Sequence, residues 1–254
     1  MSGTIHVSRP AEGVVLIRID SPPTNALGQA IRERLVAELE ALEADLSVRA
    51  MVLTGTGKAF CAGDDLREAA GRGDGAQASL NQFGRMLDRI EGARVPVIAA
   101  INGHAVGGGL ELALACDIRL GAPEAKFIGA GVNVGLMASV YRLPRLIGVA
   151  RAKAMLLTGW PSDAKTALDY GLLTGLFEAD QLLAEALKLA GRIASRAPLS
   201  VEATKRQVGR AFDMTPREAG RAAAEELAVL AKSQDHKAGI AAFVKRQEPV
   251  FTRS

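Results

Sequence analysis

The 254-residue chain has few of the residues that build cross-links or metal sites. Its two cysteines, Cys61 and Cys116, are too few for a disulfide framework, and their apolar surroundings indicate small core residues. Three histidines, far apart in the sequence and without an HExxH or CxxC pattern, give no basis for a metal site. No GxGxxG or GxSxG occurs, so the usual signatures of dinucleotide-binding proteins and serine hydrolases are also absent.

Charge and hydropathy argue against two further classes of protein. A net charge of +3 with a pI near 9.0 is too weakly basic to indicate nucleic-acid binding, although it suits a ligand with several phosphates. The longest apolar region, residues 95–116, is interrupted by polar groups such as His104 and Glu111, unlike a membrane span. The opening MSGTIHVSRP has no apolar core typical of a secretory signal. We therefore expect a cytoplasmic protein without membrane contact.

The order of the expected elements predicts an α/β body followed by an all-helical tail. Short apolar runs predict strands, and apolar residues spaced three and four apart predict amphipathic helices. The expected strands cover residues 14–19, 50–54, 95–101, 118–120 and 172–177, and the helices cover 27–46, 80–90, 108–116, 148–157 and 162–170. Further helices are expected at 180–196, 198–212, 215–232 and 235–246. Polar or glycine-rich loops are expected at 71–75 and 129–135.

Two glycine-containing turns, each leading from an apolar run into a helix, are the most informative feature of the chain. One lies in TGTGKAFCAGDDL (54–66), with Gly63 at its bend and Asp65 as the expected helix N-cap, and the other in INGHAVGGGLELALACD (101–117). Glycines ahead of a helix let backbone N–H groups approach a ligand closely. A helix N-terminus adds about half a positive charge. One donor from each turn predicts an oxyanion hole, a site for an oxygen that becomes anionic during reaction.

Five segments, spread over nearly the whole chain, carry a family resemblance. They are PPTNAL (22–27), GKAFCAGDDL (57–66), PVIAAINGHAVGGGLELALACD (96–117), ARAKAMLLTG (150–159) and FVKRQEPVF (243–251). In these segments the chain resembles the crotonase superfamily, the enoyl-CoA hydratase/isomerase family. The resemblance implies an α/β fold of stacked ββα units, the crotonase-like spiral. It also implies an acyl-CoA-binding core over 1–195 and a helical region over 196–254 that drives assembly into a trimer or a hexamer.

The resemblance further implies an acyl thioester of coenzyme A as substrate, with no separate cofactor. The thioester oxygen would accept hydrogen bonds from the backbone N–H groups of Asp64 and Gly108. Residues implied in CoA binding are Lys58, Ala62, Asp64, Leu66 and Arg246. The tail reads KRQ at 245–247 where the family usually reads Glu-Lys-Arg, so basic side chains remain for the CoA phosphates, including those of a neighbouring subunit.

Glu111 lies three residues after Gly108, on the same face of the expected helix. It matches the first of the two catalytic glutamates of family hydratases, although a carboxylate here can also simply stabilise the helix N-terminus. The second acid of the family lies four residues before a glycine in the next loop. Counted back from Gly135, that position is Gly131, and the loop contains no carboxylate.

The missing second acid argues against efficient hydration, because syn-hydration is usually assigned to two carboxylates. Proton transfer by Glu111 alone remains open, as does a base recruited from elsewhere, for which Tyr141 and His104 are candidates. Both side chains also have simpler interpretations, Tyr141 as a pocket wall and His104 as a loop residue. Candidates for lining the acyl pocket are Gly131, Asn133 and Tyr141.

The sequence therefore predicts an acyl-CoA-processing enzyme of the enoyl-CoA hydratase/isomerase type. It would stabilise a thioester enolate in the oxyanion hole and use Glu111 as the acid/base. Two alternatives stay open. One is another crotonase-type reaction, such as thioester hydrolysis or decarboxylation, and the other is a non-catalytic acyl-CoA-binding protein that has lost the second acid.

Overall fold

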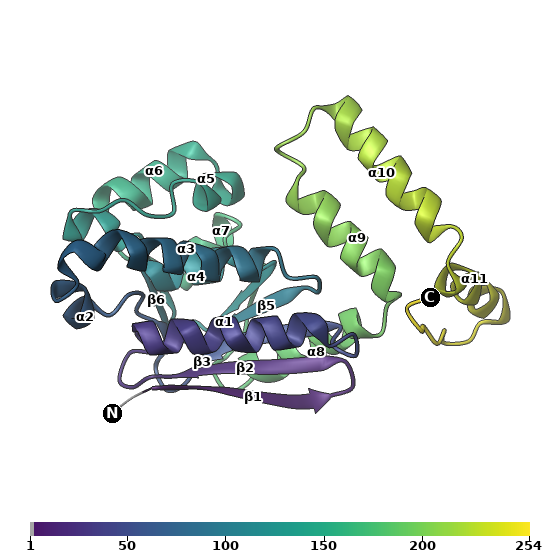
Figure 1. Ribbon diagram of the computed structural model, residues 1–254, viewed down its shortest axis with the longest axis horizontal. Helices are drawn as coiled ribbons and strands as arrows, with labels where there is room; N and C mark the ends of the chain where they lie inside the picture. The colour runs from purple at the N-terminus through teal and green to yellow at the C-terminus, as the bar shows by residue number, and fades with distance from the viewer. Residues whose placement is uncertain (1–2) are drawn as a thin grey trace.

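Two β-sheets lie among the helices of the computed structural model, which describes residues 3–254 (Figure 1). The larger sheet has the order β1-β2-β3-β5-β7-β10 and the smaller one β4-β6-β8-β9. The strands of the larger sheet are β1 (Thr4–Ala11), β2 (Val14–Asp20), β3 (Ala50–Gly55), β5 (Val97–Ile101), β7 (Ile118–Gly121) and β10 (Gly175–Leu176). Those of the smaller sheet are β4 (Ala59–Cys61), β6 (His104–Val106), β8 (Lys126–Ile128) and β9 (Ser162–Asp163). Neighbouring strands are parallel except for β1 on β2 and β9 on β8.

Helices connect the strands and then form the C-terminal part of the chain. Those within the α/β body are α1 (Gln29–Ala44), α2 (Leu66–Ala70), α3 (Ala76–Glu91), α4 (Gly108–Ala115), α5 (Arg142–Ile147), α6 (Val149–Thr158), α7 (Ala164–Asp169) and α8 (Leu182–Ala194). The tail contains α9 (Pro198–Gly209), α10 (Pro216–Leu230) and α11 (Gln234–Lys245). Two short 3₁₀ segments, Gly73–Gly75 and Ala130–Val134, lie where glycine-rich loops were expected.

The chain alternates between the two sheets in a repeated ββα order. Strands β3, β5 and β7 join the larger sheet, and the strand after each one, β4, β6 or β8, joins the smaller sheet. Helices follow each pair, so the same unit recurs three times along the chain. This is the stacked ββα architecture that the family resemblance implied. It places the ends of β4 and β6 side by side.

The inner strands of the larger sheet are buried on both faces. Val14 and Leu16 of β2 pack with the apolar side of α8, while Val15 and Ile17 between them point into the core shared with the smaller sheet. Burial on both sides explains why this strand is a continuous apolar run without the alternation of a half-exposed strand. The body is therefore organised around two apolar layers separated by the larger sheet.

Most long elements lie within a few residues of their expected limits, but short ones were missed. Strand β1 was not expected, since it is an edge strand in which only Ile5 is buried. The smaller sheet was missed as well, because strands of two or three residues are too short to show a period. The strand expected at 172–177 is only Gly175–Leu176. Asp163 is the N-cap of α7, since its side chain accepts from the Thr166 N–H.

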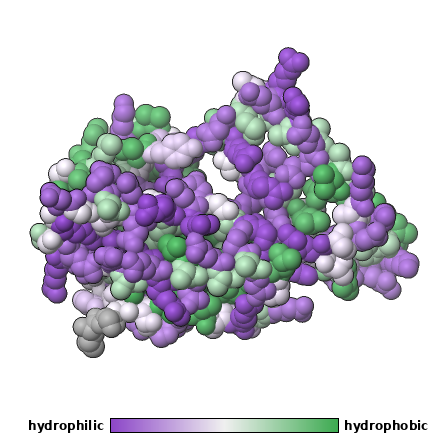
Figure 2. Space-filling model, viewed as in Figure 1, coloured by the Kyte–Doolittle hydropathy of each residue, from purple (hydrophilic) through white to green (hydrophobic). Residues whose placement is uncertain are grey.

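Helices α9, α10 and α11 form an arm that projects from the α/β body (Figure 1). The boundary expected at residues 195/196 falls between α8 and α9. A cavity of about 640 Å³ lies between α9 and the body, and the same hollow is visible in Figure 2. Within the described part of the chain, no helix combines the length and the apolar character needed to cross a membrane.

Candidate active site

The two glycine turns meet at one edge of the smaller sheet. Strands β4 and β6 are paired in parallel, so the turns that follow them leave in the same direction. A β-carbon placed on Gly63 would lie 2.6 Å from the Gly108 nitrogen and 2.7 Å from the Val106 carbonyl oxygen. Gly63 also has a φ of +86°, which L-residues rarely adopt. Glycine at 63 therefore allows the two turns to touch.

This contact leaves two backbone donors unpaired beside one another. In residues 3–254, neither the Asp64 N–H nor the Gly108 N–H donates a hydrogen bond to a protein acceptor. Their neighbours are paired, since the Gly107 N–H donates to Ile128 O at 2.9 Å and the Glu111 N–H donates to Gly107 O at 3.0 Å. Gly108 is the first residue of α4, where the N–H groups of a helix have no partner within it. Two backbone donors near the Gly63–Gly108 contact thus have no acceptor within the described residues.

Glu111 lies in the first turn of α4, and its carboxylate is held by residues that follow the 129–135 loop. One oxygen accepts from the Ser139 N–H, and the other lies 3.6 Å from Nη1 of Arg142. Arg142 also pairs with Glu91 at 2.6 Å and with Asp88 at 3.3 Å, both on α3. The side chain of Glu111 is 13% exposed, so it is enclosed but retains some access. These contacts give the carboxylate a defined orientation.

Gly131, the position at which the sequence comparison expected an acid, lies close to main chain. Gly131 is buried, and a β-carbon there would lie 3.0 Å from both Ala138 N and Leu136 O. A hydrogen bond from Leu136 N to Gly131 O, 2.8 Å long, closes this turn. Ser139, just beyond it, has a φ of +59° and is buried. The loop contains no carboxylate, and a side chain at residue 131 would crowd the main chain of residues 136 and 138.

The other candidates near this loop have partners of their own. Asn133 donates through Nδ2 to Gly159 O at 3.2 Å, and the ring of Tyr141 lies 4.7 Å from the guanidinium carbon of Arg145. His104 is exposed on β6. Within the described residues, none of the three is hydrogen-bonded to Glu111.

Phe83 of α3 was not singled out from the sequence, yet it contacts the site. A β-carbon on Gly108 would lie 2.5 Å from its Cζ atom. The ring therefore covers the start of α4, next to the free Gly108 N–H. In the sequence, Phe83 is simply an apolar residue on the apolar side of the helix expected at 80–90. A core residue would give the same pattern, so the sequence does not mark Phe83 as part of a site.

Most of the implied CoA-binding residues lie along one connection, from the β3–β4 turn to the start of α2. Lys58 is exposed in that turn, the Ala62 N–H donates to Thr24 O at 3.0 Å, and Leu66 is 62% exposed at the start of α2. Arg246 ends α11, at the opposite end of the long axis from α2 (Figure 1). A single chain therefore does not bring Arg246 to the other four residues.

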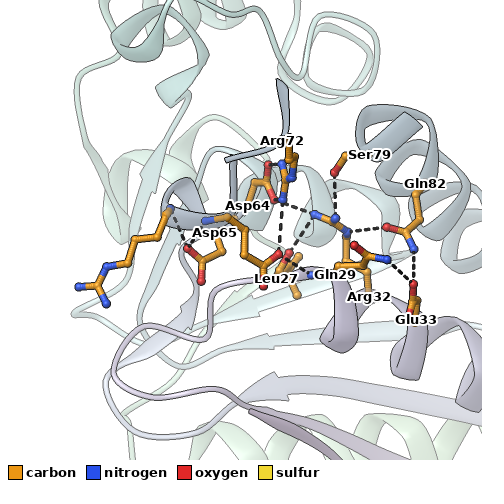
Figure 3. Close-up of polar contacts among 12 residues, drawn as sticks. Leu27, Gln29, Arg32, Glu33, Asp64, Asp65, Arg72, Ser79 and Gln82 are labelled. Carbon is orange, nitrogen blue, oxygen red and sulfur yellow. Dashed lines mark hydrogen bonds and ion pairs between the residues drawn. The ribbon is translucent and has the colours of Figure 1, made fainter. Parts of the chain in front are cut away.

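Asp64 and Asp65 have different roles although they are adjacent. Asp65 is the N-cap of α2, as expected, with its side chain accepting from Arg67 N and Glu68 N. The carboxylate of Asp64 instead binds Arg32 and Arg72 (Figure 3). Burial on its own would raise the pKa of Asp64, but the hydrogen bond and charge of Arg72, together with Arg32, outweigh it and hold that pKa below its usual value.

Both cysteines are confirmed as core residues. Cys61 and Cys116 are free and buried. Burial raises the pKa of each thiol from 9.0 to about 12, so neither has the ionised form that a reactive cysteine needs.

Comparisons with known proteins point to a single family. A family model described as enoyl-CoA hydratase/isomerase matches residues 9–254. The chain is 38% identical to (E)-benzylidenesuccinyl-CoA hydratase of Thauera aromatica over 99% of each chain. It is 34% identical to a probable enoyl-CoA hydratase of Bacillus subtilis over 94% of this chain and 95% of the relative. The crystal structure of enoyl-CoA hydratase from Bacillus anthracis superposes with a TM-score of 0.96 at 32% identity, covering 98% of this chain and 99% of that one. The chain therefore belongs to the enoyl-CoA hydratase/isomerase family and is an acyl-CoA-processing enzyme of that type.

Proposed function

We propose that the protein adds water across, or shifts, the carbon–carbon double bond of an enoyl-CoA. The thioester oxygen binds the N–H groups of Asp64 and Gly108, and Glu111 moves the proton. The observation that supports this assignment most strongly is the pair of unpaired donors beside the Gly63–Gly108 contact, one helical turn from the partly enclosed carboxylate of Glu111. The named activity of the Thauera aromatica relative, a hydratase of an unsaturated acyl-CoA, is of the same class.

Both reactions pass through an enolate whose negative oxygen lies between the two donors. One such donor contributes on the order of 10²–10³ in rate. In isomerisation Glu111 removes a proton from one carbon and returns it to another, which needs a single base. In hydration Glu111 takes a proton from water, the hydroxide adds to the β-carbon, and the same proton goes to the α-carbon. A single carboxylate can therefore carry out the proton transfers of either reaction. Isomerisation is the simpler of the two for one carboxylate, because no water molecule has to be activated.

The test measures both reactions on the same preparation. Hydration of crotonyl-CoA removes the absorbance of the conjugated thioester, and isomerisation of a trans-3-enoyl-CoA creates it. We expect Glu111→Gln to lower the rate of the active reaction by about 10²–10⁴. Glu124→Gln is the matched control, because Glu124 is exposed on the β7–β8 connection. Tight binding of both compounds without turnover would contradict the proposal and indicate an acyl-CoA-binding protein.

We also propose a homotrimer, or a pair of trimers, assembled through the arm. No residue of α10 is buried in the single chain. Large apolar side chains on α9–α11 are exposed: Val208, Phe212, Leu227, Val229, Phe243 and Val244. In such an assembly Arg246 of a neighbouring subunit binds the CoA phosphates. A single-chain mass for the wild type by light scattering would exclude this arrangement. We expect no cofactor beyond the coenzyme A of the substrate, because the thioester carbonyl itself activates the adjacent carbons.

A further inference from the structure

The carboxylate of Asp64 is the centre of a charged cluster that the sequence did not reveal (Figure 3). Arg72 binds both of its oxygens, through Nη2 to Oδ1 at 2.8 Å and through Nη1 to Oδ2. Arg32 donates through Nη1 to the same Oδ1 at 2.7 Å. Two arginines thus hold the side chain of the residue whose N–H is one of the two proposed donors.

Arg32 is buried, with 1% of its side chain exposed, and each of its nitrogens has a partner. Besides Asp64, Nη1 donates to Leu27 O at 3.0 Å, Nη2 donates to Ser79 Oγ at 2.9 Å, and Nε donates to Gln82 Oε1 at 3.2 Å. Asp64 is the only acidic partner of Arg32 among the described residues. A guanidinium withdrawn from water needs such a counter-charge. Arg32 therefore ties Asp64 to α1 and α3 together.

Arg72 approaches Asp64 from the other side, in the glycine-rich loop after α2. Its second acidic partner is Glu68, whose Oε2 lies 3.6 Å away. The same Glu68 oxygen accepts from the Gln29 N–H at 2.8 Å, at the start of α1. The cluster thus joins the 71–75 loop, α2 and α1 around Asp64.

Stability alone is a weak reason for such a cluster, since a buried ion pair often contributes no more than apolar side chains of similar size. The chemistry supplies a stronger reason. A carboxylate next to the oxyanion hole repels an enolate, and in a partly buried site this repulsion is poorly screened. Asp64 and Glu68 carry two negative charges, and Arg32 and Arg72 carry two positive charges, so the cluster is neutral and an anion nearby meets no net repulsion.

We infer that Arg32 and Arg72 are positioning residues for the oxyanion donor at Asp64. They hold its main chain at the glycine turn and cancel its carboxylate charge, so that an enolate can form beside it. This inference rests on the proposed function, because it assumes that the Asp64 N–H binds the thioester oxygen.

The test compares Arg72→Gln, Asp64→Asn and the double variant. Two quantities are measured: kcat and KM for the more active enoyl-CoA substrate, and the ultraviolet band of the enolate when acetoacetyl-CoA is bound. We expect Arg72→Gln to lower kcat by about 10- to 100-fold, with a smaller change in KM, and to weaken the enolate band. Adding Asp64→Asn should restore much of both, since the net charge of Arg32, Glu68 and residues 64 and 72, which is −1 in the single variant, then returns to zero. Arg72→Lys, which keeps the charge, should retain most of the activity and checks that the loop tolerates substitution.

The matched control is Arg34→Gln, also on α1, where Arg34 is exposed and pairs with Glu38. It should change kcat by no more than about twofold. An active wild type whose kcat is unaffected by Arg72→Gln would overturn this inference alone, as would a double variant no better than the single one. A wild type with neither turnover nor an enolate band would instead overturn the proposed function.

Discussion

Restoring a glutamate at residue 131 is a direct test of how the loop after β8 is built. If the absence of a second carboxylate were all that limits hydration, Gly131→Glu would create an efficient hydratase. The structure predicts the opposite, because the new β-carbon would lie 3.0 Å from two backbone atoms, Ala138 N and Leu136 O. Main-chain atoms cannot rotate away as a flexible side chain can, so the 136–138 segment would have to move.

Overpacking of this kind costs about 1–3 kcal/mol. For a chain of this length, each kcal/mol lowers Tm by about 2–4 °C. We therefore expect a measurable fall in Tm by differential scanning calorimetry and no gain in crotonyl-CoA hydration. Gly191→Glu on α8 is the matched control, because nothing lies within 4 Å of its β-carbon position. Hydration that rises at least tenfold at an unchanged Tm would show that the loop has room for the acid and that our reading of it is wrong.

Four further outcomes can be checked, two with variants and two on the native protein. Gly63→Ala should reduce kcat more than Gly108→Ala, as measured by steady-state kinetics on both variants. The β-carbon at residue 63 would meet main chain, and its φ of +86° is unfavourable for alanine. The nearest atoms to a β-carbon at residue 108 belong to the ring of one side chain. Arg142→Gln, which releases one side of the α4 glutamate, should lower kcat by about tenfold at similar KM, and an unchanged kcat would remove Arg142 from the site. Cys61 and Cys116 should resist alkylation in the native protein at pH 8, as read by mass spectrometry. Their thiol pKa values rise from 9.0 to about 12 on folding, so their contribution to stability is complete below pH 9 and is lost between pH 9 and 12, which urea unfolding at several pH values would detect.

The elements that could be predicted from sequence are those with a long local pattern. Strand β2 and helix α1 each carry enough apolar residues in a row, or at helical spacing, to identify their type. The two glycine turns were also predictable, because a close approach of backbone to backbone leaves glycine as the residue that fits. Strand β1 could not be expected, since an edge strand with a single buried residue has almost no apolar signal.

The side-chain contacts of the site were beyond prediction for a different reason. Arg142 reaches Glu111 across 31 positions of sequence, and Arg32 reaches Asp64 across 32, so no local pattern encodes either pair. Arg32 was especially hidden, since a charged residue in an amphipathic helix is normally read as solvent-exposed, whereas here 1% of the side chain is accessible. Such residues become visible only when the fold shows what lies opposite them.

The parallel pairing of β4 with β6 separates the binding of an anionic oxygen from the acid–base chemistry, two functions that many enzymes assign to the same side chains. In the proposed site, the groups offered to the thioester oxygen are amides of the polypeptide itself, supplied by two successive ββα units, and an exchange of side chain at residue 64 does not remove them. The loop after β8 belongs to the next unit and is free to change its acids, its length and its packing. A scaffold arranged in this way can keep its means of holding an anion while the reaction carried out around that anion drifts from one lineage to another.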